Sequence, residues 1–391
     1  METKQNIPRN PRRRSPFQRN RRLQAEMLSI VLLSVVAVFV VLGLLLPDKD
    51  FSESENRSLA KFPKFSENFF SDLGSYVADQ FPGRDMWMSV NLSLNKALGQ
   101  KEASGVYLCE DDYLMQIPAE PNYPQAERNL IAINQFAENY PEVNMVMCVA
   151  PNAVTVLEEK LPANAPVRNQ KADLAYIQDS LYAVPFVDVT RALRMHRSEY
   201  LFYKTDHHWT SLAAAYAFEE IAPMLDIEPP ALQNYTVYTV STTFEGTLSS
   251  KSGSHDARDV VEIYVPDTTI EYYVQYPTGD PVSSFYNRAA LDQKDHYTVF
   301  FGGNYPRVDI TTSANTHRSL LLFKDSYANC MVQFLYPYFD HITMIDPRYY
   351  YDNLELVIKS EAVTDVLFLY NADTFLGDTS LADVLTIDRS E

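Results

Sequence analysis

The hydrophobic and polar positions follow one repeating pattern from about residue 123 onward. Short apolar runs that end in polar residues occur five times, as "VNMVMCVAP", "PFVDV", "SLLLFKDS", "HITMIDPR" and "AVTDVLFLYN". Segments with helical spacing lie between them, and the clearest cover residues 124–140, 170–181 and 210–225. Continuous apolar strands that alternate with helices are typical of a parallel sheet covered on both faces. The pattern therefore predicts an α/β fold with three layers, α/β/α.

Two other stretches depart from this pattern. Residues 232–312 are rich in Tyr, Thr and Val with turn residues between them, as in "NYTVYTVSTTFEG", so we expect an antiparallel β insertion that packs on the sheet and shapes a substrate groove. Residues 66–99 have helical spacing that is interrupted at Pro82-Gly83, which predicts two helices joined by a turn. We expect a linker with these helices over residues 47–122 and the α/β domain over residues 123–391.

A long apolar run, "MLSIVLLSVVAVFVVLGLLL", covers residues 27–46 and has no charged residue. About 20 apolar residues cross a bilayer as a helix, so this run predicts a single transmembrane helix. Residues 1–26 carry eight lysines and arginines against two glutamates, which predicts a cytoplasmic basic tail and an extracytoplasmic main domain. A cleaved signal peptide is the alternative, but the run is longer than a usual signal core and "LLLPDKDF" has no small-x-small cleavage site.

The net charge and the number of cysteines exclude some classes of partner and of fold. The chain carries −18 at pH 7, of which residues 47–391 account for −24, so nucleic acid and anionic lipid are not expected partners of the main domain. The arginines of the tail are interpreted as the flank of a membrane helix rather than as a nucleic-acid site. Three cysteines are too few for a disulfide framework, although one bridge is allowed outside the cell. Cys148 lies in an apolar run and is expected to be a buried, inert thiol.

Residue types that carry nucleophilic catalysis follow the predicted strands. In chain order these are Asn152, Asp206, His208, Ser326 and Asn371. Because the active groups of parallel sheets gather at the carboxyl ends of the strands, we expect these side chains to meet at one edge. Serine, histidine and a carboxylate form a nucleophilic triad, and asparagine can stabilise an oxyanion. The N–H groups of a helix that opens at Ser326 would add to that stabilisation.

Each of these residues also has a structural interpretation. Ser326 could be the N-cap of the helix that follows it, Asp206 a surface charge or a cap, and Asn371 a loop residue that tolerates left-handed dihedral angles. His207 and His208 could bind a metal, but neighbouring side chains point in different directions and the sequence has no H-x₃-H motif or cysteine partner beside them. We therefore expect neither a metal nor a cofactor.

Four motifs together resemble those of a known family. They are "TDHHWT", "LLLFKDSYANCMVQFL", "FGGNYP" and the "ENR…FPGRD" stretch. They are similar to motifs of the DHHW family of bacterial membrane-anchored proteins, which is related to the SGNH-hydrolase-like domains of alginate O-acetylation proteins. The resemblance spans roughly residues 51–375. It implies an SGNH-hydrolase-like, flavodoxin-like parallel sheet.

The resemblance also implies roles for single residues. The Asp-x-His of the acetylation proteins falls on Asp206 and His208, and their serine falls on Ser326. "LYNAD" takes the place of the family's asparagine block, which makes Asn371 the oxyanion residue. Two glycines of the family pattern are replaced, one by Lys324 and the other at Tyr370 or its neighbour.

The order of these residues implies a circular permutation. In ordinary SGNH enzymes the serine precedes the aspartate and histidine, whereas here it follows them. The strands that end at Asn152 and near Val189 would then be the last two of the usual order. The strands that end at Asp325, Asp346 and Asn371 would be the first three.

The function implied by these residues is acyl transfer. His208 would take the proton of Ser326, whose oxygen attacks an acetyl ester, and Asp206 would fix the imidazole tautomer. Water or a sugar hydroxyl would then resolve the acyl-enzyme, so the protein would be an O-acetyltransferase or an acetylesterase. Trp209, together with His207 and Asn152, is a candidate substrate contact, although a packed core tryptophan is the alternative.

The partners follow from the predicted location. An extracytoplasmic enzyme would act on a cell-surface or secreted polysaccharide, and the resemblance implies a multi-pass membrane O-acyltransferase as the source of acetyl groups. The competing hypothesis is a non-catalytic surface module that binds glycan or assembles an export complex. In that case its 26 tyrosines and 21 phenylalanines would supply the contact face.

Overall fold

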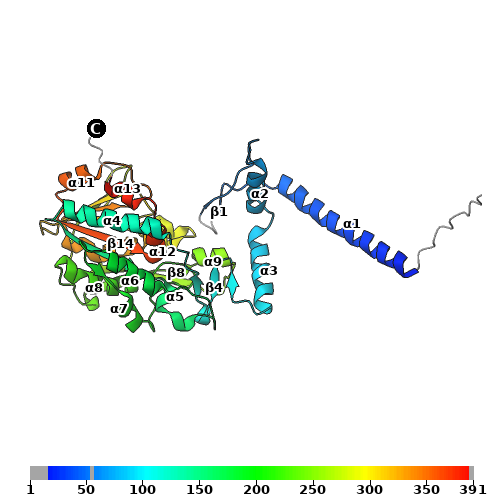
Figure 1. The fold of residues 1–391 in the computed structure, drawn as a ribbon, viewed down its shortest axis with the longest axis horizontal. Helices are drawn as coiled ribbons and strands as arrows, with labels where there is room; N and C mark the ends of the chain where they lie inside the picture. Colours follow the sequence, from blue (N-terminus) through cyan, green and yellow to red (C-terminus); the bar gives the residue numbers. More distant parts are fainter. Residues whose placement is uncertain (1–15, 53–56, 387–391) are drawn as a thin grey trace, which may run out of the picture. The chain divides into compact units, whose positions relative to one another are not determined.

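The computed structural model describes residues 16–52 and 57–386, which form two compact units (Figure 1). The first unit holds the described residues up to Trp87, and the second begins at Met88. Of the predicted basic tail, residues 1–26, the part from 1 to 15 lies outside the described residues.

The first unit is helical. Helix α1 (Pro16–Leu45) contains the stretch Leu23–Leu45, which is long and apolar enough to cross a membrane. The short strands β1 (Phe51–Ser52) and β2 (Arg57–Ser58) pair antiparallel and are followed by α2 (Phe69–Asp79) and by α3 (Arg84–Ala97), which continues into the second unit. The two predicted helices are therefore present. Gly83 between them has a φ of +70°, which glycine adopts without a steric cost.

The second unit is organised by a seven-stranded sheet in the order β10-β11-β13-β12-β14-β6-β7. Its parallel part consists of the five predicted strands: β6 (Asn144–Ala150), β7 (Phe186–Val187), β12 (Ser319–Lys324), β13 (His341–Ile345) and β14 (Asp365–Asn371). Every residue of β12 and β14 is buried, which explains why these runs are apolar without alternation.

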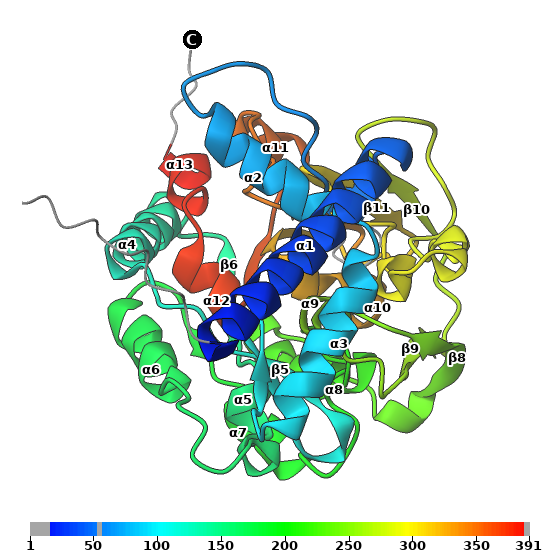
Figure 2. The same cartoon turned by 90° about the vertical axis from the view of Figure 1, so that its right-hand side faces the viewer.

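Helices cover both faces of this sheet, as the pattern predicted. Residues of each strand alternate between two apolar clusters, so that Leu320 and Leu322 lie in one and Leu321 and Phe323 in the other. The first cluster includes α5 (Ala153–Val156), α7 (Thr190–Met195), α8 (Ser211–Ile221) and α10 (Val332–Leu335). The second includes α4 (Tyr123–Asn139), α6 (Gln170–Ser180), α11 (Leu354–Ser360), α12 (Ala372–Gly377) and α13 (Leu381–Thr386). Figure 2 shows α4 and α13 side by side on that second face.

The β-rich segment 232–312 divides between two places. Strands β8 (Tyr235–Phe244) and β9 (Asp259–Pro266) form a separate antiparallel ribbon, and α9 (Thr247–Ser252) lies in the connection between them. Strands β10 (Tyr272–Gln275) and β11 (Arg307–Thr312) instead extend the main sheet, because β11 pairs antiparallel with β13. Part of the expected insertion is thus an edge of the sheet itself.

Smaller elements complete the unit. Strands β3 (Glu102–Ala103), β4 (Val106–Leu108) and β5 (Leu114–Gln116) form a small antiparallel sheet. Single turns of 3₁₀ helix are η1 (Glu110–Asp112), η2 (Glu158–Lys160), η3 (Ala222–Leu225), η4 (Leu232–Asn234), η5 (Arg288–Asp292), η6 (His296–Val299), η7 (Ser326–Cys330) and η8 (Tyr336–Tyr338). The three cysteines are free thiols, and Cys148 is buried as expected.

The loop before Asp206 is held to the β8–β9 ribbon by one buried carboxylate. Asp259, at the start of β9, accepts hydrogen bonds from the Tyr200 hydroxyl, the N–H of Lys204 at 2.6 Å, the N–H of Thr205 at 2.7 Å and the Thr205 hydroxyl at 2.5 Å. A buried carboxylate with this many donors fixes the position of the chain just before Asp206.

We predict that Asp259→Asn lowers the free energy of unfolding by about 2–4 kcal/mol, because the amide NH₂ would face donors that need an acceptor. The measurement is urea unfolding followed by near-UV circular dichroism. Asp267→Asn is the control, since Asp267 accepts a bond only at an exposed site, from Thr236, and should change the free energy by less than about 0.5 kcal/mol. Equal unfolding midpoints for the two variants would contradict this role of Asp259.

Candidate active site

Ser326 is placed by the end of strand β12. It is the first residue of η7, and the N-cap is Asp325, whose carboxylate accepts the N–H of Tyr327 at 2.8 Å. The alternative that Ser326 itself is the cap is therefore wrong. In the described stretch from Ser319 to Tyr336, Ser326 is the only residue that is not buried. The fold thus presents one hydroxyl at the carboxyl end of an otherwise enclosed segment.

His208 and Asp206 lie directly behind this hydroxyl. The Nε2 atom of His208 is 2.7 Å from the Oγ of Ser326, and the Nδ1 atom is 2.6 Å from Oδ1 of Asp206. The same carboxylate oxygen accepts the backbone N–H of His208 at 3.0 Å, so the Asp-x-His spacing closes a local turn. Since Nδ1 faces a carboxylate, it carries the ring hydrogen, and Nε2 offers its lone pair to the serine hydroxyl.

The second oxygen of Asp206 is held by helix α9. The backbone N–H of Thr247 donates to Oδ2 at 2.8 Å and the Thr247 hydroxyl donates at 2.9 Å. Gly246 lies so close that a Cβ atom there would be 2.3 Å from the Cβ of Asp206. Only glycine fits this approach. The ribbon connection is therefore part of the support of the carboxylate.

The charge state of Asp206 follows from these contacts. Burial by itself raises the pKa of this carboxyl group, but the two neighbouring imidazoles and the hydrogen bonds from His208 and Thr247 outweigh burial. The pKa of Asp206 is consequently held well below its usual range, and the group is a carboxylate at neutral pH.

Two rings hold the His208 imidazole in place. Tyr297 stacks on it with 3.8 Å between ring centroids and 12° between planes, and His207 lies 3.9 Å away at 37°. Two rings at this separation do not fit on one face of an imidazole, so they lie on opposite faces. The Tyr297 hydroxyl also donates to the carbonyl of Ser326 at 2.8 Å, which links the ring stack to the serine segment.

His207 has a defined tautomer. Its Nδ1 atom is 2.9 Å from the Thr247 hydroxyl oxygen, and that hydroxyl already gives its hydrogen to Asp206. Nδ1 of His207 must therefore donate, which leaves a lone pair on Nε2 of the neutral ring. Partial burial, and then the neighbouring His208, lower the pKa of His207 to about 4, so the ring is neutral at pH 7. Its side chain is 34% exposed, unlike that of His208.

A metal is not favoured at this cluster, although the ligand atoms of Asp206, His207 and His208 lie within 4.8 Å of one another. Both Nδ1 atoms are donors in the hydrogen bonds described above, and both oxygens of Asp206 are acceptors in them. These atoms satisfy each other without an ion.

Trp209 and Asn152 belong to the packing of the site rather than to its surface. Trp209 is fully buried, and its Nε1–H donates to the carbonyl of Tyr327 at 3.0 Å. The Tyr327 hydroxyl in turn donates to the carbonyl of His207 at 2.5 Å, so the two motif segments clamp each other. Asn152 is bonded to Gln170 through its backbone N–H at 2.8 Å and its side-chain oxygen at 2.5 Å. Of the three expected substrate contacts, Trp209 and Asn152 are thus buried and only His207 is partly exposed.

Asn371 lies beside the serine segment but its amide points elsewhere. Its backbone N–H donates to Asp325 at 2.8 Å. Its side-chain oxygen caps α12 by accepting the N–H of Asp373 at 3.0 Å, and it also accepts from Asn152 at 3.2 Å. Its Nδ2 makes one long bond of 3.5 Å to the carbonyl of Ala150. The oxyanion role expected for Asn371 would require this bond to be exchanged.

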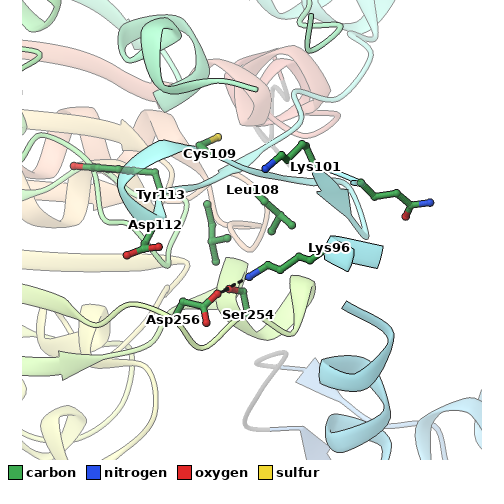
Figure 3. Close-up of a pocket in the computed structure, with 10 residues that line it drawn as sticks. Lys96, Lys101, Leu108, Cys109, Asp112, Tyr113, Ser254 and Asp256 are labelled. Atoms are coloured by element: carbon green, nitrogen blue, oxygen red, sulfur yellow. Dashed lines mark hydrogen bonds and ion pairs between the residues drawn. The ribbon is translucent and has the colours of Figure 1, made fainter. Parts of the chain in front are cut away.

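Two cavities of the second unit lie around these elements. One of about 490 Å³ lies at the carboxyl ends of β13 and β14 and is lined by Arg348, Tyr351 and Thr374, the last of which hydrogen-bonds the side chain of Asp325. The other, of about 250 Å³, lies between the end of α3, strands β4 and β5, and the segment after α9 (Figure 3). There Lys96 reaches Asp256 in an ion pair of 2.5 Å. The first cavity shares the sheet edge with Ser326.

Known proteins resemble this chain in sequence and in fold. A sequence model of the family described as DHHW protein matches residues 133–345, more than half of the chain. A DHHW family protein from Eubacterium siraeum superposes with a TM-score of 0.63 and 24% identity, over 73% of this chain and 95% of that one. Bacillus cereus PatB1, solved with a sulfonyl adduct, gives 0.58 and 21%, over 70% and 98%.

A weaker structural similarity and a negative result complete the comparison. The O-acetyltransferase domain of Pseudomonas putida AlgJ has a TM-score of 0.46 and 14% identity, over 71% of this chain and 95% of that one. No curated protein matches the sequence. The family resemblance predicted from the motifs is confirmed by the match over residues 133–345.

A buried lysine lies directly before the Asp325-Ser326 pair. The ammonium of Lys324 donates to side-chain oxygens of Asn304 and Asn329, each at 3.0 Å, and lies 3.7 Å from the carboxylate of Asp346. Asn304 belongs to the "FGGNYP" motif, and this hydrogen bond to the buried ammonium gives the motif a structural role. Burial lowers the pKa of Lys324 to about 8, although the neighbouring Asp346 opposes this.

Because the pKa of Lys324 is lower in the folded chain, we predict that stability depends on pH. In the unfolded chain the amine titrates near 10.5 and in the folded chain near 8. Between these values the unfolded state binds more protons, so stability rises with pH there by up to about 3 kcal/mol. Lys324→Met removes the titrating group, so the free energy of unfolding of the wild type minus that of the variant should grow from pH 8 to 10.5 in urea titrations. A difference that stays constant with pH would contradict this assignment.

Proposed function

The chain belongs to the DHHW family, and from this premise we propose that it is a serine-dependent acyl-transfer enzyme, an O-acetyltransferase or acetylesterase that acts on a polysaccharide. The observation that carries the proposal is the hydrogen-bonded row from the half-buried hydroxyl of Ser326 to His208 and Asp206, with 2.7 Å and 2.6 Å between successive partners. Nucleophile, base and orienting carboxylate in this order are the requirements of a catalytic triad.

The proposed reaction has two halves. Oγ of Ser326 attacks the carbonyl carbon of an acetyl ester while Nε2 of His208 takes its proton. The imidazolium, stabilised by Asp206, then protonates the leaving alcohol and the acyl-enzyme remains. Water or a sugar hydroxyl next gives its proton to Nε2 and attacks the acyl carbon. The imidazolium then returns this proton to Oγ of Ser326 as the bond between Oγ and the acyl carbon breaks, which releases acetic acid or an acetylated sugar and restores the serine and the neutral imidazole.

The negative charge of the tetrahedral intermediates needs donors. The backbone N–H of Ser326 is suited to this, because the first N–H groups of a helical turn have no partner within it. Asn371 is the second proposed donor. Its amide is next to the same segment and would exchange its long bond to Ala150 for the oxyanion.

We also propose that the fold is a circular permutation of the SGNH order. The spatial order β13-β12-β14-β6-β7 becomes 2-1-3-4-5 when β12 is counted as the first strand, which is the flavodoxin-like order. On this count the strands that come first in the chain, β6 and β7, are the fourth and fifth. The serine then follows the first strand, as in the unpermuted enzymes.

The proposed location is the outer face of a membrane, with α1 as an uncleaved anchor and the N-terminus in the cytoplasm. The apolar stretch Leu23–Leu45 and the basic residues before it support this orientation. A polysaccharide acceptor at the cell surface suits that location, and the cavity at the sheet edge, with the exposed ring of Tyr351 and the guanidinium of Arg348, offers it a groove. The acetyl groups would come from a multi-pass membrane O-acyltransferase.

The triad is tested by covalent labelling and ester hydrolysis. A sulfonyl adduct is described for Bacillus cereus PatB1, so phenylmethylsulfonyl fluoride is a fitting reagent here. We expect a single adduct on Ser326 by mass spectrometry, no adduct in Ser326→Ala or His208→Ala, and hydrolysis of 4-nitrophenyl acetate reduced about 10³-fold or more in both.

The matched control for this experiment is Ser241→Ala. Ser241 also lies 2.6 Å from a histidine, the Nδ1 of His296, but it is not part of the row described above. This variant should label and hydrolyse as the wild type does. Labelling elsewhere than Ser326, or undiminished hydrolysis by Ser326→Ala, would reject the enzyme and favour a glycan-binding module.

His207 is the proposed contact for the acceptor hydroxyl, because its Nε2 carries a lone pair and its side chain, which is partly exposed, lies beside His208. His207→Asn keeps a donor for the Thr247 hydroxyl but removes the Nε2 position. We expect it to hydrolyse 4-nitrophenyl acetate within about threefold of wild type and to transfer acetyl groups to chitopentaose about tenfold less well. Equal loss of hydrolysis and transfer, measured by chromatography of both products, would instead indicate a purely structural role.

A further inference from the structure

Helix α2 has an apolar face that the first unit leaves uncovered. Its apolar residues fall at positions 69, 70, 73, 76 and 77, which is one face of a helix. None of the residues of α2, all of which the structure describes, is buried. Phe70 is 84% exposed and Val77 is 54% exposed, and the preceding Phe62 and Phe65 are 62% and 91% exposed. A face this apolar needs a partner.

The C-terminal end of α2 is tied to the place where α1 ends. The hydroxyl of Tyr76 donates to the carboxylate of Asp48 at 2.8 Å. The backbone N–H of Lys49 donates to Gln80 at 3.0 Å, and the Gln80 amide donates to the carbonyl of Lys49 at 2.9 Å. Lys49 is four residues beyond Leu45, so about 14 Å of extended chain at most separates them. Helix α2 therefore lies beside the exit of the apolar helix.

The turn after α2 packs on α1 itself. Phe81 stacks on Phe39 with 5.0 Å between centroids, and Trp87 meets the same ring edge-on at 5.9 Å. In the described stretch from Leu23 to Asp50, only Phe39 and Gly43, one turn apart on one face, are half-buried, and the other residues are exposed. Phe39 lies six residues before Leu45, or about 9 Å along the helix axis. A bilayer around α1 would therefore reach the rings of the turn.

We propose that Phe62, Phe65, α2 and the turn to Trp87 form an interfacial collar that lies in the outer surface of the lipid bilayer around the end of α1. The depth suits this, because interfacial helices insert about 5–10 Å into the headgroup and acyl boundary. The charge suits it too, since residues 57–87 carry four basic and four acidic groups and are neutral overall. Aromatic rings are the residues most favoured at this boundary.

The collar goes beyond the acyl-transfer function and depends on α1 spanning the bilayer, not on the chemistry of Ser326. Its consequence is mechanical. The chain that leaves the membrane would be fixed to the surface at Asp48 and from Phe62 to Trp87.

The two tryptophans of the chain make a direct test available. Trp209 is fully buried in the second unit, whereas Trp87 is 42% exposed in the collar. The full-length protein is reconstituted in phosphatidylcholine vesicles, with and without bromine at carbons 6 and 7 of the acyl chains. We expect the brominated lipid to reduce Trp87 emission about twofold, as insertion to this depth requires. Trp87→Phe should remove the quenched component and leave the emission of Trp209.

Variants test whether the exposed rings of the collar contact lipid. Phe65→Ser with Phe70→Ser should halve the quenching while 4-nitrophenyl acetate hydrolysis stays unchanged, because both rings are exposed and both contact Phe69 of the first unit rather than the triad. Leu356→Ser, at an exposed position of α11 in the second unit, is the control and should leave quenching intact.

Three outcomes would overturn the proposal. The first is unquenched Trp87 in vesicles that retain the protein against carbonate extraction. The second is a cross-linked dimer through position 70 that accounts for the protection of Trp87. The third is extraction of the protein by carbonate, which would remove the anchor and with it the collar. Sulfonyl labelling of Ser326 is measured on the same samples, so failure of the enzyme proposal is recognised separately.

Discussion

One buried carboxylate, that of Asp206, sets the geometry on which the candidate site depends. One of its oxygens accepts both N–H groups of His208 and the other accepts both donors of Thr247. The carboxylate therefore joins two chain segments about 40 residues apart, and turning it would break bonds in both. In a buried setting each lost bond leaves part of a charge unsatisfied, which is costly. The orientation of the imidazole is thus fixed by the folded chain before any substrate arrives.

The sheet provides the other half of the arrangement. Ser326 follows a central strand that is paired on both sides, by β13 and β14. His208 comes from an irregular loop, so its position relative to the strand has to be secured by side chains. The reciprocal bonds of Trp209 and Tyr327 between the two motif segments do this. Trp209 therefore sets the distance between the His208 loop and the Ser326 segment, and this role explains why its side chain is fully buried.

The sequence predicted those parts of the structure that depend on local pattern. The five strands of the parallel sheet are continuous apolar runs, and Ser326 follows the end of one of them, as the strand-end rule predicts. Asp206 and His208 meet Ser326 from the loop after α7 and not from a strand end, because β7 already ends at Val187. Thr247 and Tyr297 were not predicted, because they lie in the short helices α9 and η6, whose position depends on tertiary packing. Gly246 had a weak signal, since glycine in "FEGT" marks a turn but does not reveal which carboxylate approaches it. Asp325 and not Ser326 is the cap because Asp325 has the extended dihedral angles of an N-cap, whereas Ser326 is already the first residue of the turn.

The three free cysteines determine how the fold would respond to an oxidising environment. Cys148 and Cys330 are fully enclosed, and burial raises the pKa of Cys330 to about 12 and that of the partly covered Cys109 also to about 12. Only a thiolate exchanges with disulfides, so at neutral pH these sulfurs are almost inert towards oxidants and towards folding catalysts that make and shuffle disulfides. The mature fold can therefore keep unpaired sulfur in an oxidising compartment, and it owes nothing of its stability to the redox state around it.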